Sequence, residues 1–112
     1  MDRAFYSEIR QIVKDDFQKY MHGSYGFSFT AATSKIQDDY LNSIHLDEIE
    51  KALFSLAIAV ECKKQGELRI DIKTNLERMI QDKVLDNYDD PLTPEDKGII
   101  ALDLQVIGIL VK

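Results

Sequence analysis

Ala52-Leu53-Phe54-Ser55-Leu56-Ala57-Ile58-Ala59-Val60-Glu61-Cys62 is the stretch of sequence that decides the fold. Only Ser55 and Glu61 interrupt its apolar run, so a helix built from it has no polar face and must be covered by other elements. The stretch is about half as long as a bilayer requires. We therefore expect a long central helix inside a globular domain and no membrane span.

Both ends of this helix are marked in the sequence. Asp47, Glu48 and Glu50 precede it, and acidic residues in a first turn favour the positive end of the helix dipole. Lys63 and Lys64 occupy the predicted last turn, with Gly66 just beyond.

Apolar side chains at three- and four-residue spacing predict an amphipathic first helix over residues 2–21. Its apolar face consists of Phe5, Ile9, Ile12, Val13, Phe17, Tyr20 and Met21. His22-Gly23 predicts the end of this helix, because glycine tolerates the left-handed conformation that closes many helices. The same position gives His22 a role in complementing the helix dipole.

A second, shorter helix is expected to begin at a capping box formed by Ser34 and Gln37. Between the first two helices, residues 23–34 carry no charge, although Asp, Glu, Lys and Arg make up 30% of the chain. Aromatic and small residues alternate over residues 25–30, which fits an extended connection with one buried face. An apolar contact patch for a partner is the alternative.

Two more helices are predicted after the apolar stretch. Residues 67–85 fit a fourth helix, although Leu68, Ile70 and Ile72 alternate as in a short strand. Thr93-Pro94 predicts the start of a fifth, with a capping threonine and a proline in the first position. Branched residues over 99–111 leave a strand as a competitor there, and the start signal favours a helix.

These elements together predict an all-α fold. A chain of 112 residues has room for one core. We expect residues 1–112 to form a single compact domain, a bundle of about five helices with a long central apolar helix.

Charge and chemistry narrow the possible functions. With 20 acidic and 14 basic residues, the net charge is −6, which opposes binding to nucleic acid and to anionic membranes and suits a basic protein partner. The N-terminal residues do not resemble a signal peptide, and a single cysteine cannot form an internal disulfide, so a cytoplasmic protein is expected.

No set of residues for catalysis, a cofactor or a metal is recognisable. His22 and His45 lack metal-ligand spacing, and Cys62 lies in the apolar stretch, where a small core residue is the simpler interpretation. Residues 86–96 hold five acidic residues but lack the glycine and the final glutamate of a calcium loop. We therefore expect a binding protein, not an enzyme.

In size, acidity and helical content the chain resembles the small immunity proteins that bacteria make against their own nuclease toxins, in contact-dependent inhibition systems and among colicins. That resemblance implies a cognate, basic toxin as partner. The expected contacts are the acidic and aromatic side chains of the predicted turns and helix ends, namely Tyr25, Asp38, Asp39, Asp86, Tyr88, Asp89, Asp90, Glu95 and Asp96.

Two other readings remain open. The apolar stretches at 52–62 and 99–111 could exceed what one core hides, which would favour a homodimer. A regulatory inhibitor that mimics the charge of nucleic acid is the third hypothesis, although Lys and Arg interrupt most acidic runs.

Overall fold

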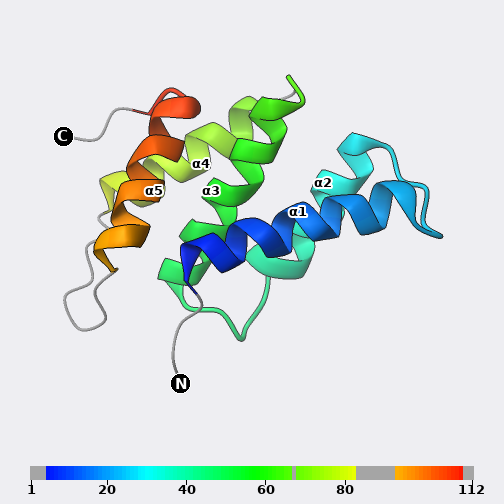
Figure 1. Cartoon of the computed structure of the whole chain (residues 1–112), viewed down its shortest axis with the longest axis horizontal. Coiled ribbons are helices and arrows are strands. Elements are labelled where there is room, and N and C mark those ends of the chain that lie inside the picture. Colours follow the sequence, from blue (N-terminus) through cyan, green and yellow to red (C-terminus); the bar gives the residue numbers. More distant parts are fainter. Residues whose placement is uncertain (1–4, 67, 83–92, 110–112) are drawn as a thin grey trace.

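The computed structural model describes residues 5–66, 68–82 and 93–109. These residues form five α-helices and no strand (Figure 1). In chain order the helices are α1 (Tyr6–His22), α2 (Phe29–Leu41), α3 (Glu48–Lys64), α4 (Ile70–Gln81) and α5 (Pro94–Val106). The prediction of an all-helical, compact fold is confirmed for the described part of the chain. The predicted helical residues 2–4, 67, 83–85 and 110–111 lie outside it, whereas the predicted helical residues 5, 68–69, 82 and 107–109 are described and not helical.

Helix α3 packs against each of the other four helices. Every residue from Ala52 to Cys62 is buried, including Ser55 and Glu61. The Asp47 side chain accepts a hydrogen bond from the Glu50 backbone N–H, and the Glu50 carboxylate accepts one from the backbone N–H of Asp47. With 17 residues, α3 has the same length as α1.

Helix α2 begins earlier than predicted. Its N-cap is Ser28, whose hydroxyl accepts a hydrogen bond from the Ala31 backbone N–H, so the predicted start at Ser34 is wrong. The Phe29 ring stacks on Phe17 of α1, with ring centroids 5.0 Å apart. This contact between helices stabilises a first turn that the local sequence alone only weakly favours. The predicted extended connection is therefore wrong from Phe29 onward.

The end of α1 at His22 is confirmed, but for a different reason from the predicted one. Gly23 has φ −88°, which is not left-handed. A Cβ at this position would lie 2.5 Å from the carbonyl oxygen of Lys19. Glycine is needed here because the chain passes too close to the preceding turn for any side chain.

The predicted apolar face of α1 is also shifted. Phe5 and Ile12 are 52% and 38% exposed, whereas Tyr6, assigned to no face, is completely buried. Ile9 and Val13 are buried as expected. The buried face of α1 includes Tyr6 because its hydroxyl donates a hydrogen bond to Asp103 inside the protein.

The last two helices follow the start signals in the sequence. Residues 70–81 are helical, so the strand alternative for Ile70 and Ile72 is wrong. In α5 the Thr93 hydroxyl accepts a hydrogen bond from the Asp96 backbone N–H and Pro94 lies in the first turn, as predicted.

Candidate partner-binding surface

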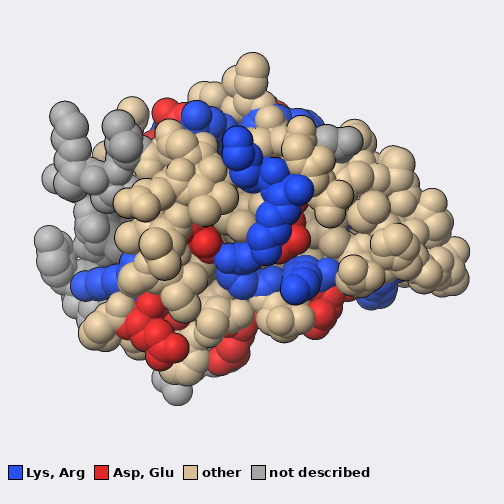
Figure 2. Space-filling model, turned by 45° about the horizontal axis from the view of Figure 1, so that its top comes forward, with Lys and Arg blue, Asp and Glu red and all other residues tan. Residues whose placement is uncertain are grey.

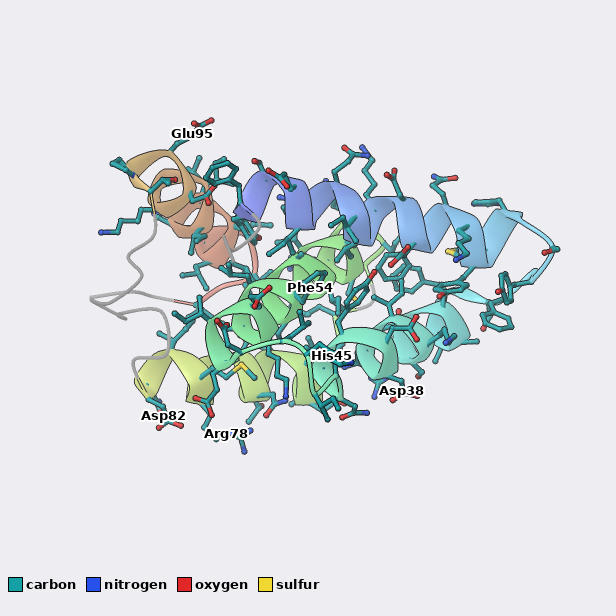
Figure 3. All side chains as sticks on the ribbon, turned by 90° about the horizontal axis from the view of Figure 1, so that it is seen from below. Asp38, His45, Phe54, Arg78, Asp82 and Glu95 are labelled. Atoms are coloured by element: carbon teal, nitrogen blue, oxygen red, sulfur yellow. The ribbon has the colours of Figure 1, made fainter. Side chains whose placement is uncertain are left out.

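The predicted contact residues do not gather on one surface. Asp38 is exposed on the outer side of α2, and Glu95 is exposed at the beginning of α5. Figures 1 and 3 place α2 and α5 at opposite ends of the molecule, whose longest extent is 42 Å. Four further candidates, Asp86, Tyr88, Asp89 and Asp90, lie outside the described residues.

Asp96 supports the fold instead of lying on the surface. It is only 4% exposed, and its Oδ2 accepts a hydrogen bond of 2.9 Å from the backbone N–H of Tyr6. That N–H belongs to the first turn of α1, where backbone donors have no partner within the helix. Asp96 therefore joins the starts of α1 and α5, which leaves it little surface for a partner.

A buried polar network joins α1, α3 and α5. The Tyr6 hydroxyl donates a hydrogen bond of 2.6 Å to Oδ2 of Asp103, and Arg10 Nη1 donates one of 2.7 Å to the same oxygen. Arg10 Nη2 lies 3.6 Å from Glu61 Oε1, which also lies 3.6 Å from Lys64 Nζ. The network is therefore a chain of alternating charges between three helices.

Burial and the bond to Asp103 raise the pKa of Tyr6 far above its usual value. Burial alone would lower the pKa of Arg10, but the nearby Asp103 carboxylate outweighs it and raises that pKa. Both groups therefore keep their protons, and the network stays a paired structural unit.

Figure 2 shows Lys and Arg side chains running in a band across the middle of one face, with the largest acidic areas along its lower edge.

At the other end of the molecule, three aromatic side chains form a cluster between α1 and the start of α2. The Tyr20 ring meets Tyr25 edge to face at 5.1 Å and stacks on Phe27 at 6.0 Å. Tyr25 and Phe27 also contact each other, with centroids 5.4 Å apart. Phe29 and Phe17 form a separate stacked pair between α1 and α2.

Two tyrosine–carboxylate pairs hold α2 against α1. The Tyr20 hydroxyl donates a hydrogen bond of 2.8 Å to Oδ2 of Asp39, and the Tyr40 hydroxyl donates one to Asp16. The bond to Asp39 raises the pKa of Tyr20 to about 12. Partial burial opposes the charge on Asp39, but hydrogen bonds from Lys35 and Tyr20 outweigh it and lower the pKa of this carboxyl.

These contacts define the α1–α2 surface, which consists of Tyr25, Lys35, Asp38 and Asp39. Tyr25 is 50% exposed although its ring has two aromatic neighbours. The hydrogen bond to Asp39 contributes most to the raised pKa of Lys35. Asp39 is already paired twice, which leaves Asp38 as the more accessible carboxylate.

Three further features of the described residues bear on ligand binding. They contain no group of three His, Cys, Asp or Glu side chains placed to hold a metal ion. Cys62 is fully buried, with its Sγ 3.9 Å from Thr33 Oγ1, as expected for a core residue. A hollow of about 310 Å³, lined by Glu77, Ile80, Gln81, Gly108 and Ile109, contains none of the predicted contact residues.

Several residues that shape the α1–α2 surface were not singled out in the sequence. Asp16 was not among the predicted contact residues, yet it accepts the hydrogen bond from the Tyr40 hydroxyl. The pair Lys35–Asp39, at 2.6 Å, has the spacing of four residues that favours ion pairs on a helix, so this signal was present in the sequence. The contact between Tyr40 and Asp16 depends on how two helices pack and had no local signal.

No protein-family model, no curated protein and no solved structure matches this chain. Among the residues that the structure describes, no helix combines the length and apolar character needed to cross a bilayer. Function must therefore be argued from the geometry of the chain itself.

Proposed function

We propose that the protein is a non-catalytic binding protein of the cytoplasm that recognises a basic protein through the α1–α2 surface. In the form suggested by its resemblance to immunity proteins, the partner is a cognate toxin of the nuclease type, which the protein binds and neutralises.

The observation that carries this proposal is the exposed, well-supported ring of Tyr25. Aromatic side chains dominate binding energy at protein interfaces, particularly when they are already ordered in the free protein. Contacts with Tyr20 and Phe27 hold the Tyr25 ring, so little conformational freedom is lost when a partner covers it. The exposed half of the ring is then available as an anchor.

Charge supports the choice of a basic partner. The net charge of −6 steers a positively charged protein towards the molecule and raises its encounter rate. Asp38 supplies an exposed carboxylate on α2, and Asp39 keeps its negative charge because its pKa is lowered. A Lys or Arg of the partner can pair with Asp38 while another part of the partner covers Tyr25.

The scaffold in this proposal is α3, acting as a long central apolar helix. Support comes from the burial of its residues 52–62 and from its packing against all four other helices. A surface element gains precision when its supporting helices cannot shift, and the tyrosine–carboxylate pairs fix α1 against α2.

The test begins with the product of the neighbouring gene, because an immunity protein is normally encoded beside its toxin. Co-expression should relieve the toxicity of that product, and calorimetry should show binding that weakens as salt rises. The double variant Tyr25→Ala with Asp38→Asn should weaken binding by about 100-fold, as for loss of an interface anchor.

A matched control removes the same charge elsewhere. Glu95→Gln removes an exposed carboxylate at the start of α5, so the net charge equals that of the test variant. Binding by this control should change less than about 3-fold, since only steering is reduced. Equal weakening by both variants would rule out the α1–α2 surface, and a harmless neighbouring product that does not bind would rule out the immunity function.

A further inference from the structure

Helix α5 buries two of its four charged residues, Asp96 and Asp103, and exposes apolar ones. An amphipathic helix normally buries apolar residues and exposes charged ones. In α5 the carboxylates of Asp96 and Asp103 are buried, whereas Leu102 and Val106 are 63% and 49% exposed. The exposed side of α5 is therefore more apolar than the exposed side of an ordinary amphipathic helix.

Glu95 and Lys97 are exposed in the first turn of α5, and beyond that turn its exposed side carries no charge. It consists of Gly98, Ala101, Leu102, Gln105 and Val106, which we call the α5 stripe. These residues recur at three- and four-residue spacing, so they form one continuous side of the helix. In a chain with 30% charged residues, such a stripe indicates a surface that is covered by another element.

We propose that the α5 stripe is the interface of a homodimer, in which α5 of one copy packs antiparallel against α5 of the other. This inference is independent of the proposed binding of a basic partner.

The order of small and large side chains along the α5 stripe suggests that a second copy of the protein covers it. The stripe is small at its N-terminal end, with Gly98 and Ala101, and large at its C-terminal end, with Leu102 and Val106. A twofold axis near Leu102 places Val106 of one copy opposite Gly98 of the other. Large side chains then meet small ones at both ends, as ridges fit grooves between packed helices.

Gly98 has the space that this arrangement needs. It lies inside α5, and a Cβ built there would meet no atom within 4 Å. The fold of one copy therefore gives no reason for a glycine at this position, where glycine lowers helix stability. Close approach of a side chain from a second copy supplies the reason.

Charge also favours self-association here over binding of a charged partner. Each copy carries a net charge of −6, so two copies repel through most of their surfaces. An uncharged stripe minimises that repulsion and gives a basic protein nothing to pair with. Because α5 and α2 lie at opposite ends of the molecule, the dimer leaves the α1–α2 surface accessible (Figure 1).

The first test is the mass in solution. Light scattering and sedimentation equilibrium should show the mass rising from 12.9 kDa towards twice that value as concentration increases from about 10 μM to about 500 μM. Leu102→Glu puts an unpaired charge at the axis and should raise the dissociation constant at least about 100-fold. Gly98→Gln fills the groove and should also weaken the dimer, while circular dichroism shows that the helices are retained.

The matched control is Ile44→Glu, which introduces the same charge at a side chain that is 91% exposed and lies between α2 and α3. It should leave the dissociation constant unchanged. A wild-type mass that stays monomeric throughout the range would overturn the proposal, as would a dimer that survives Leu102→Glu.

Cross-linking tests the orientation. Leu102→Cys should form a disulfide-linked dimer on oxidation, whereas the native Cys62 is buried. Gly98→Cys and Val106→Cys should each stay unlinked alone, because equivalent positions four residues from the axis lie about 12 Å apart along the helices. An equal mixture of these two variants should cross-link. If each single variant cross-links as readily as the mixture, the antiparallel arrangement is wrong.

Discussion

Replacing Tyr6 by phenylalanine tests the buried network with the least disturbance of packing. The variant keeps the buried ring and removes only the hydroxyl that donates to Asp103. A hydrogen bond to a charged group contributes roughly 1.5–3 kcal/mol. Asp103 still accepts from Arg10 on the same oxygen, so its charge is not left unpaired and the expected loss is about 2 kcal/mol.

Urea unfolding followed by circular dichroism should show this loss as a lower midpoint with an unchanged slope, because the area exposed on unfolding is the same. For a domain of this size the melting temperature should fall by roughly 10 °C. Tyr25→Phe is the matched control: it removes a hydroxyl from a half-exposed ring and should cost less than about 0.5 kcal/mol. If the two variants lose equal stability, the Tyr6 hydroxyl does not stabilise the fold through Asp103.

Three further changes have definite expected results. Gly98→Ala should stabilise the monomer by about 0.5–1 kcal/mol in urea unfolding, because the site is helical and open; a loss of stability would contradict this. Gly23→Ala should destabilise by more than about 2 kcal/mol, because its Cβ would collide with the carbonyl oxygen of Lys19; a neutral result would show that the turn adapts. Because the pKa of Tyr20 is raised above 10, its contribution to stability is complete below pH 10 and is lost as pH rises towards 12. Asp39→Asn should shift the ionisation of Tyr20 towards pH 10 in ultraviolet titration, and an unchanged curve would exclude the hydrogen bond as the cause.

The fold could be predicted from the sequence wherever the signal was local. The capping Thr93, the acidic first turn of α3 and its apolar run each act within a few residues, and the structure has these features where they were expected. The start of α2 was missed because the capping box at Ser34 was preferred to Ser28, which is also a local N-cap signal. The stacking of Phe29 on Phe17, which stabilises the added turn, is a contact between helices and has no signature in one segment.

The candidate site was harder to predict for the same reason. A carboxylate in a sequence looks the same whether it faces water or a hydroxyl on another helix. Asp38 is exposed as expected, whereas Asp96 accepts a hydrogen bond from the backbone N–H of Tyr6, which lies ninety positions away in the chain. The helical periodicity of α5 did not reveal this, because its buried face contains two carboxylates that are paired with α1.

The network between α1 and α5 also has a consequence for synthesis on the ribosome. Tyr6 and Arg10 are synthesised before their common partner Asp103, which follows 97 and 93 positions later. Until then the nascent chain can pair α1 with α2 and α3 only while these polar groups remain hydrated. The packing of α1 against α5 must therefore wait for Asp103, so a ribosome stalled before this residue holds a chain that is still accessible to chaperones and proteases.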